Sequence, residues 1–399
     1  MADCDVDILI VGGGLAGAVL MLALADAGYS TLLVEAKPFS GSVQTDFDAR
    51  SLALSPASVR ILQMLHIWPL LQEHATAIET IHVSDQHHFG SAHLGGNKKN
   101  PLGFVVEMQH INRALYQLLD RQYTMAPAQL IAYDAVSHLA TVKTAVGQST
   151  VRSRLVVAAD GVDSVVRHLC HLPAQLKDYD QCAIVANIGL ARAHQQVAYE
   201  RFTASGPLAL LPMTDQRASL VWALPPQEAE RLMLVEEHVF LNHLQRTFGY
   251  RLGRFIKVGC RVAYPLRQLI MPQCVAGSVV FVGNAAHTLH PVAGQGFNLG
   301  LRDVAMLVQC IAKHGLGDDM LQIYQTSRRF DQTAMAYFTD GLVELFTSRL
   351  PGAALVRGAG LIALDNIPVL KSLLVRYARG FTGIIPDLVC GIPLHLETF

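Results

Sequence analysis

The sequence predicts an α/β protein that combines a parallel sheet flanked by helices, an inserted second β-sheet and a helical C-terminal region. Three observations predict this fold. Short, continuous apolar runs, typical of parallel strands buried on both faces, end three times in glycine-rich turns. Stretches of alternating or mixed polarity lie between these turns, as in a separate sheet. From residue 331 onward the pattern becomes helical and apolar, with Gly and Pro punctuation.

Composition limits the function classes. The chain has 399 residues, enough for two or three structural units, and 51% of them are apolar. A formal net charge of −1 gives no electrostatic footprint for nucleic acid, so we expect no nucleic-acid partner. Seven scattered cysteines without a C-x-x-C pair indicate buried thiols in a reducing compartment, and we expect a cytoplasmic protein.

The first element is a βαβ unit. Residues 8–11 are expected to form a strand, residues 15–27 a helix closed by Gly28, and residues 31–34 a second strand that ends at Glu35. Acidic residues precede this apolar run and glycines interrupt it, so it predicts neither a signal peptide nor a membrane-spanning helix. The other long uncharged stretch is broken by Pro, Gly, Asn and His, and we expect no spanning helix there either.

The turn of this unit carries a dinucleotide fingerprint, Gly12-x-Gly14-x-x-Gly17, with Leu15 and Ala16 before its last glycine. The first glycine permits the tight turn, the second lets a pyrophosphate approach the backbone, and the third lets helix and strand pack closely. Glu35 is placed to accept hydrogen bonds from ribose hydroxyls. The alternative is a tight turn in an unrelated α/β protein, and the fingerprint alone does not choose between NAD and FAD.

A second signature follows a predicted strand at residues 154–159. It reads Asp160-Gly161-x-x-Ser164-x-x-Arg167, and its Asp-Gly turn and helix could seat a pyrophosphate or a ribityl chain. Taken alone, the pattern is equally compatible with an ordinary turn.

The third signature is the most specific. A strand at residues 278–282 leads into Gly283-Asn284, and a helix is expected from Gly296 to about His314. The loop before that helix holds Pro291, Gly294, Gln295, Gly296 and Asn298. Backbone N–H groups at a helix N-terminus can stabilise negative charge on a reduced flavin ring. Three distant segments that form one site imply one extended cofactor, and together they indicate FAD.

These segments divide the chain into three regions. The expected boundaries are 1–77, 101–175 and 270–330 for a discontinuous FAD-binding domain, 78–100 and 176–269 for a substrate domain, and 331–399 for the C-terminal helical region. The last region is apolar and mildly basic, which favours peripheral contact with an anionic inner membrane. A core or subunit-interface role for its apolar residues is an equally good interpretation.

The three signatures, in this order and spacing, resemble the class A flavoprotein monooxygenases, which share the p-hydroxybenzoate hydroxylase fold with a Rossmann-like FAD-binding domain. Further strings are similar to the ubiquinone-biosynthesis hydroxylases, closest to the 2-polyprenyl-6-methoxyphenol hydroxylase branch. These strings are Asp48 to Ser55, Leu102 to Glu107, Gly206 to Pro212, Tyr264-Pro-Leu266, Arg328-Arg329, and the run from Gly283 to Asp303.

The resemblance implies roles for further residues. Glu35 would bind the adenosine ribose, Arg50 would lie along the cofactor, and Arg113 would reach the phosphates. Asp160 and Gly161 would serve both FAD and a transient NADPH or NADH. The flavin-loop candidates for the catalytic site are His290, Pro291, Gly294, Gln295 and Gly296, and no catalytic base is singled out.

Two positions depart from the family pattern. Asn284 stands where the wider family has an Asp that holds a ribityl hydroxyl. Because an amide oxygen still accepts a hydrogen bond, we expect FAD binding to survive. Met108 stands where relatives often carry an amide side chain, for which the neighbouring Gln109 could substitute. Histidine and cysteine groupings elsewhere fit no closed zinc set, so no metal site is expected.

The implied function is hydroxylation of a prenylated phenol with NAD(P)H and O2, through a C4a-hydroperoxyflavin inside a dry chamber. The substrate, O2 and a ubiquinone-biosynthesis complex are the expected partners. Three alternatives remain open: a related hydroxylase for another ring position or another small aromatic, a flavin-stabilised structural subunit of a biosynthetic complex, and an NAD-linked dehydrogenase.

Overall fold

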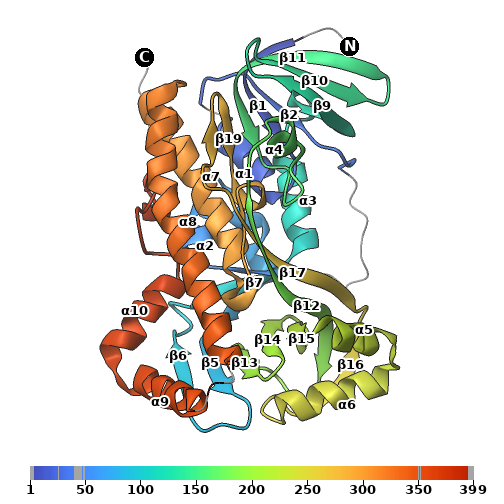
Figure 1. Ribbon diagram of the computed structural model, residues 1–399, viewed down its shortest axis with the longest axis vertical. Coiled ribbons are helices and arrows are strands. Elements are labelled where there is room, and N and C mark those ends of the chain that lie inside the picture. Colours follow the sequence, from blue (N-terminus) through green and yellow to red (C-terminus); the bar gives the residue numbers. More distant parts are fainter. Residues whose placement is uncertain are drawn as a thin grey trace.

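The computed structural model describes residues 4–25, 27–39, 47, 50–348, 350 and 352–393. Two large sheets lie at opposite ends of an elongated molecule, and a long helix runs beside both (Figure 1). The N-terminal end of the described chain lies at the end of the molecule that holds the first sheet.

The first sheet is parallel at its centre. Its order is β18-β19-β11-β1-β2-β8, with β10 and β9 continuing from β11 as an antiparallel extension. The pairings of β1 with β2 and β11, of β11 with β19, and of β2 with β8 are all parallel. The bounds are β1 Cys4–Val11, β2 Thr31–Val34, β8 Thr124–Met125, β9 Ala128–Asp134, β10 Leu139–Thr144, β11 Gly147–Ala158, β18 Val275–Ala276 and β19 Val279–Phe281.

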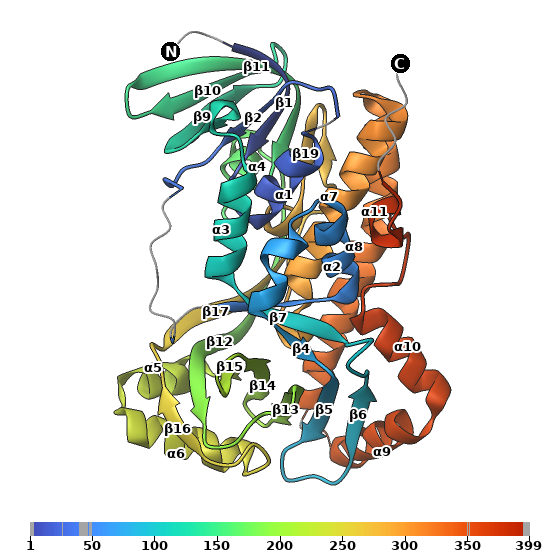
Figure 2. The same cartoon turned by 180° about the vertical axis from the view of Figure 1, so that it is seen from behind.

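Helices cover both faces of this sheet, so its central strands are buried. Every residue of β2 and the last four of β1 are buried, which explains their continuous apolar runs. The helices are α1 (Leu15–Ala23), α2 (Pro56–Met64), α3 (Met108–Leu118), α4 (Val165–Leu169) and α7 (Gln295–His314). Helix α7 lies in the middle of the molecule, beside α1 and α8 (Figure 2).

The second sheet is mostly antiparallel and has the order β20-β17-β12-β15-β14-β13-β5-β6, with β16 beside β12. Its bounds are β5 Thr80–Asp85, β6 Ser91–Gly95, β12 Gln175–Leu190, β13 Val197–Thr203, β14 Gly206–Met213, β15 Arg217–Leu224, β16 Phe255–Val258, β17 Val262–Ile270 and β20 His287–Thr288. Helices α5 (Pro226–Leu234) and α6 (Glu237–Phe248) pack an apolar cluster onto its outer face. The opposite face is therefore free to line a chamber.

A small third sheet, β3-β7-β4, stands between the two large ones (Figure 2). Its strands are Ser51–Leu54, Gly103–Glu107 and Ala75–Ile78, in that order. Strand β7 leads directly into α3. Short 3-10 turns occur at Trp68–Leu70, Gln72–His74, Arg121–Tyr123, Gly283–Ala285 and Val292–Gly294.

The C-terminal region is helical, as predicted. Helix α8 (Asp318–Thr347) has 30 residues and is therefore about 45 Å long, enough to run beside both sheets. Helices α9 (Ala353–Asn366) and α10 (Pro368–Ala378) cover the open side of the second sheet, and α11 (Asp387–Cys390) returns to α2 (Figure 1).

Of the described helices, none is long and apolar enough to cross a membrane alone. One pair, α9 and α10, passes the test of length and composition together but is bent by 91° at its break.

The expected fold class is confirmed, while several element bounds differ. The first helix ends at Ala23, because Leu24 already caps it. Strand β11 begins at Gly147 rather than 154, since its outer half pairs with β10. Helix α8 begins at Asp318, before the expected start of the helical region. The proposed domain boundaries stay a prediction.

Candidate active site

Four strand ends bring the three sequence signatures together. Strands β2, β1, β11 and β19 are neighbours and parallel, so their carboxyl ends share one edge of the sheet. Glu35, Gly12, Ala159 and Val282 are the residues that follow them. Ligands of open α/β sheets bind at this edge, outside the carboxyl ends of the strands.

The fingerprint glycines make the close contacts that their spacing predicts. Gly12 has φ +103°, and a Cβ on it would lie 2.5 Å from the Ala159 carbonyl oxygen. A Cβ on Gly17 would lie 1.9 Å from the Gly12 oxygen, so helix and strand pack too closely for any side chain. Gly14, which caps α1, has no atom within 4 Å of its Cβ position. The open space beside Gly14, at a helix N-terminus, suits an anionic group.

Glu35 is held by the turn itself. The Gly13 N–H donates to Glu35 Oε2 at 2.6 Å, and the Lys37 N–H donates to Glu35 Oε1 at 2.8 Å. These bonds fix the carboxylate at the end of β2, beside the fingerprint turn.

The second signature contributes a backbone cradle and a buried acid. Gly161 has φ +86° and open space at its Cβ position. Asp160 Oδ2 accepts from the Val166 N–H at 3.2 Å, whereas Asp160 Oδ1 is buried without a partner among the described residues. Burial raises the pKa of the Asp160 carboxyl. An unpaired buried oxygen is costly, so this site fits a ligand that brings a hydrogen-bond donor.

Ser164 and Arg167 serve the fold in this structure. The Ser164 hydroxyl caps α4 by accepting from the Arg167 N–H at 3.1 Å. The Arg167 guanidinium donates to the carbonyls of Val162 at 2.6 Å and Ala285 at 3.1 Å. Arg167 therefore ties the second signature to the third rather than reaching outward to a phosphate.

The third signature begins with Gly283, whose backbone N–H is bound by a buried carboxylate. Gly283 has φ +57°, and its N–H donates to Asp303 Oδ2 at 3.0 Å. His287 Nε2 lies 2.5 Å from the same Asp303 oxygen. The next residue, Asn284, is exposed to the space in front of the sheet, and its side chain is free to meet a ligand there.

A network of buried charges supports this loop. Arg328 Nε donates to Asp303 at 2.7 Å and Arg328 Nη1 to Asp331 at 2.8 Å, while Arg302 Nε donates to Asp331 at 2.9 Å. Burial alone would raise the pKa of Asp303, but His287 and Arg328 outweigh it and hold that pKa well below its ordinary value. In the sequence, Arg302, Asp303 and Arg328 stand out only as parts of resembling strings, and their spacing does not indicate the network.

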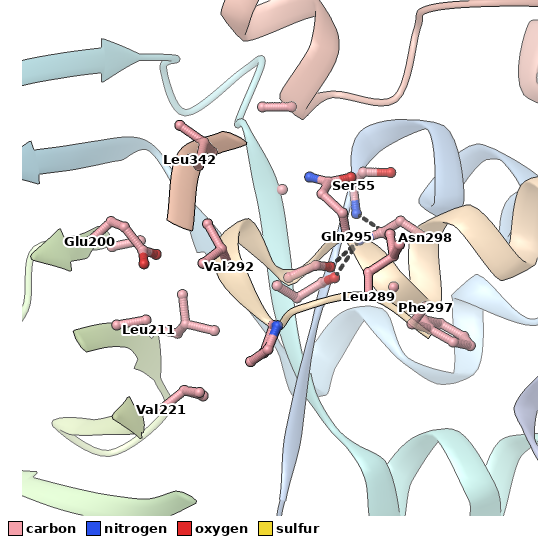
Figure 3. A pocket seen from close by; sticks show the side chains of 18 of the residues that line it. Ser55, Glu200, Leu211, Val221, Leu289, Val292, Gln295, Phe297, Asn298 and Leu342 are labelled. Atoms are coloured by element: carbon pink, nitrogen blue, oxygen red, sulfur yellow. Dashed lines mark hydrogen bonds between the residues drawn. The ribbon is translucent and has the colours of Figure 1, made fainter. Parts of the chain in front are cut away.

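The loop before α7 is locked in position. Gly294 adopts the left-handed conformation, with φ +61°, and caps the helix. Asn298 Oδ1 accepts from the Ser55 N–H at 2.8 Å and from the Ser58 hydroxyl at 2.7 Å, and Nδ2 donates to the carbonyls of Ala53 and Gly294 (Figure 3). Asn298 therefore positions the loop through four hydrogen bonds.

A cavity of about 1270 Å³ begins at these loops and continues to the second sheet. This volume exceeds the 300–1,000 Å³ typical of a small-molecule site, so it has room for a cofactor and a second molecule. Its wall includes most of the predicted site residues: Gly14, Leu15, Ala16, Arg50, Gly161, Gly283, Asn284, Pro291, Gly294, Gln295, Gly296 and Asn298.

Other predicted site residues lie outside this wall. Gly12, Gly17, Glu35 and Asp160 stand behind the lining residues and shape the turns. Arg113 is exposed on α3 and is not brought to the cavity. The exposed Arg113 side chain gives no support to the expected contact with the phosphates.

His290 is buried and does not line the cavity. Its Nε2 lies 3.4 Å from Gln181 Oε1, and its ring makes an edge contact with Tyr179. Burial lowers the pKa of His290 to about 4, so the ring is neutral near pH 7. Packing explains this residue.

Met108 lines the cavity, whereas Gln109 does not. The Gln109 side chain donates to Glu107 Oε2 at 2.8 Å and so does not replace an amide at position 108. Arg50 lies over the Tyr264 ring at 5.0 Å. Asp48 and Ala49 of the same string lie outside the described residues. No cluster of three or more metal-binding side chains occurs in the described part of the chain.

Glu200 is a polar residue of the wall that the sequence does not single out. It is an acid on β13, and Figure 3 shows its side chain pointing into the cavity from the second sheet. Its alternation with apolar neighbours was a signal that it shares their face, but the sequence did not show which face is the inner one.

Comparisons with known proteins agree with this geometry. The pattern of the FAD binding domain family matches residues 5–339. The ubiquinone hydroxylase UbiL of Rhodospirillum rubrum is 36% identical over 98% of this chain and 94% of its own length. The 3-demethoxyubiquinol 3-hydroxylase of Escherichia coli is 31% identical over 95% of this chain and 100% of its own length.

Solved structures share the fold. The p-nitrophenol 4-monooxygenase PnpA of Pseudomonas putida superposes with a TM-score of 0.78 at 17% identity, covering 96% of this chain and 99% of that one. PqsL of Pseudomonas aeruginosa, in complex with 2-aminobenzoylacetate, gives a TM-score of 0.74 at 22% identity, covering 90% and 99%.

Proposed function

Because the chain belongs to the FAD binding domain family and is an FAD-dependent monooxygenase, we propose that it hydroxylates the ring of a prenylated phenol in ubiquinone biosynthesis. NADPH or NADH is the transient reductant and O2 the oxygen donor. The two relatives named above are a ubiquinone hydroxylase and a 3-demethoxyubiquinol 3-hydroxylase, and each matches this chain over nearly its full length. This similarity supports the proposed pathway.

The residues present fit FAD. Gly14 and Gly161 leave open space where a side chain would stand, and Asp160 keeps one buried oxygen without a protein partner. We propose that the N-terminus of α1 holds the pyrophosphate and that Asn284 and the backbone from Gly294 to Gly296 meet the flavin end. When bound, FAD takes a hydride from NAD(P)H and activates O2 for transfer of one oxygen atom.

The proposed substrate class rests on the part of the cavity that continues beyond the glycine loops. Beyond the glycine loops its wall is almost wholly apolar, with side chains from the second sheet and the C-terminal helices, including Val221, Leu211, Leu342, Leu361 and Leu374. A dry wall suits both an isoprenoid tail and an oxygen transfer that water would divert to peroxide. The chamber thus favours a long apolar phenol over a small polar aromatic.

The cavity reaches the surface between α9 and α10. Val356, Leu370 and Leu373 line it and are also 66%, 43% and 56% exposed. Outside this mouth, Leu355 and Val369 are 64% and 66% exposed, and α10 has no buried residue. We propose that this face rests on an anionic membrane that supplies the substrate.

Nearby cations support a membrane over a second copy of the chain. Arg379, just after α10, donates to Asn100, which places the exposed Lys98 and Lys99 beside the apolar face. Exposed Arg376 lies on α10 itself. Each such cation contributes about 1 kcal/mol toward an anionic leaflet.

Vesicle sedimentation tests this contact. We expect the holoenzyme to sediment with anionic vesicles more than with neutral ones, and Val369→Asp or Leu355→Asp to reduce that binding. The matched control is Leu234→Asp, which changes an 83% exposed leucine on α5. Equal vesicle binding by all variants, or a dimer broken only by the α9 and α10 variants, would contradict membrane contact.

The function itself is tested in cells and with purified protein. Deletion of the gene should abolish ubiquinone and accumulate a prenylated phenol, whose mass identifies the ring position. Purified holoenzyme should oxidise NAD(P)H only when a prenylated phenol is present and should release the hydroxylated ring. Bound FAD without substrate-dependent oxidation would instead support the structural-subunit alternative, and an unchanged quinone profile would support a different aromatic substrate.

A further inference from the structure

Glu200 is the one acid among the described residues that line the cavity. Alternation along β13 puts Ala198, Glu200 and Phe202 on one face of the strand, and these three line the cavity together with Tyr199. The Arg201 side chain lies on the other face and donates to the Thr247 carbonyl. Glu200 thus stands on the inner face of the second sheet, opposite the flavin loop (Figure 3).

The surroundings of Glu200 are apolar. In the strand register it faces Val83 of β5 and Ala209 of β14, and Ala209 faces Val221 of β15. All three neighbours also line the cavity. No side chain in the described part of the chain hydrogen-bonds or pairs with the Glu200 carboxylate, so the group has no structural partner. Burial raises its pKa to about 7.

The other titratable side chains of the wall do not neutralise this acid. Three are arginines with other contacts: Arg357 donates to Asp85 at 2.8 Å, Arg267 to Asp178 at 3.1 Å, and Arg50 lies over Tyr264. The remaining ones are phenols: Tyr199, Tyr264 and Tyr377. On the adjoining α8, Asp340 is bound by Lys177 and Tyr179, and Glu344 by Lys177.

An unpaired carboxyl in an apolar chamber lowers stability and contributes nothing to packing, which points to a functional role. We propose that Glu200 is the general base that takes the proton from the phenol hydroxyl of the substrate. The inference rests on the proposed function, since it requires a phenol in this chamber.

The proton transfer is balanced within the monooxygenase reaction. The phenolic O–H bond breaks, its electron pair stays on the oxygen and enriches the ring, and the proton bonds to a Glu200 oxygen. One atom of O2 bonds to the ring carbon as a hydroxyl group, the C–H bond at that carbon breaks, and its proton returns to the phenolic oxygen. The other atom leaves as water, and its formation consumes the proton that Glu200 has taken, which regenerates the carboxylate. NAD(P)H supplies the two electrons as a hydride, and solvent supplies the one further proton that the reaction consumes. A base with a pKa near the working pH suits such a cycle.

The experiment compares the wild-type holoenzyme with Glu200→Gln, with Glu200→Asp, and with the control Glu230→Gln on the exposed side of α5. For wild type, hydroxylated product per minute should rise with pH through about 7, because only the carboxylate accepts a proton. Glu200→Gln should form product about 10²-fold more slowly and lose this pH dependence. Glu200→Asp should retain part of the rate and part of the pH dependence, and Glu230→Gln should match wild type.

A second readout needs no turnover. Binding of a prenylated phenol and of its methyl ether is measured with oxidised holoenzyme, without NAD(P)H. A hydrogen bond to a carboxylate should favour the phenol about tenfold at pH 8 and less at pH 6. In Glu200→Gln the preference should no longer change with pH.

Two failures are distinguishable. If wild type and Glu200→Gln hydroxylate within about threefold of each other, with the same pH profile and the same phenol preference, Glu200 is not the base, although the proposed function stands. If no prenylated phenol binds to wild type or stimulates its NAD(P)H oxidation, the proposed function and this inference both fail.

Discussion

Replacing Asp303 by Asn should lower the free energy of unfolding by about 3 kcal/mol or more. Asp303 accepts hydrogen bonds from Arg328 at 2.7 Å, Gln332 at 3.1 Å and the Gly283 N–H at 3.0 Å, and it pairs with His287 at 2.5 Å. Removing one partner of a buried ion pair costs about 3–5 kcal/mol. Because Arg328 keeps Asp331 as a second partner, we expect the lower end of this range.

An amide cannot replace the carboxylate in this position. Asn has one acceptor oxygen, and its NH2 group would face another donor. Both the FAD-free and FAD-loaded proteins should be unfolded with denaturant, so that cofactor loss is separated from loss of fold stability. The control is Asp178→Asn, whose exposed pair with Arg267 at 3.1 Å is screened by solvent and should contribute little to stability.

The pH dependence has a definite sign. The folded-state pKa of Asp303 is lowered, so its stabilising contribution is present above the ordinary carboxyl pKa of about 4 and is lost as pH falls toward the folded value. Wild type and Asp303→Asn should therefore converge in strongly acidic solution. A loss below about 1 kcal/mol near pH 7, equal to that of the control, would refute the reasoning.

The remaining predictions concern the glycine turns and the flavin loop. Gly14→Val should fold normally yet lose FAD, because its side chain meets no protein atom but fills the cradle; full flavin absorbance after purification would contradict this. Gly17→Ala should instead unfold the FAD-free protein, since its Cβ would lie 1.9 Å from the Gly12 oxygen, and thermal denaturation measures the difference. Asn284→Asp should retain FAD, measured by flavin fluorescence titration; complete loss would show that the loop is used differently. Asn298→Ala should cost about 2–3 kcal/mol in denaturant unfolding, because two buried and two part-buried groups lose their hydrogen bonds; an unchanged midpoint would count against its positioning role.

The sequence predicts the cofactor half well because its signals are local. Gly17 is required by its contact with Gly12 within one turn, and each strand that leads into a signature ends in a short, continuously apolar run. Such features need no knowledge of the distant chain. The fold class and the cofactor could therefore be predicted from the sequence, and both predictions are confirmed.

Other parts of the site depend on contacts between segments far apart in sequence. Arg167 resembles a phosphate ligand in the linear pattern, yet its partner is a carbonyl 118 residues away. Asn298 binds the strand that holds Ala53, and no spacing rule links the two. In the sequence, Glu200 is an acid in a strand of mixed polarity. Only the folded sheet shows that its side chain lies on the inner face. Local sequence periodicity does not predict long-range pairing of this kind.

The second sheet is joined to the third signature by a continuous ladder. Strand β12 pairs with β17 from Gln175 to Val185, and β17 pairs in turn with β20, which contains His287. A rigid-body swing of the substrate half would break these hydrogen bonds, so hinge opening is disfavoured during turnover. The one irregularity in the β12–β17 ladder, between Asp178 and Cys182, permits only a local bend.

Opening of the chamber is instead expected at the mouth between α9 and α10. Helix α9 is anchored, because Arg357 binds Asp85 and a Cβ on Gly358 would lie 2.8 Å from the Phe89 carbonyl. Helix α10, with no buried residue, can shift without disturbing the ladder. Admission of substrate and release of product are therefore expected to proceed by displacement of one surface helix, while the catalytic chamber keeps a fixed shape throughout the cycle.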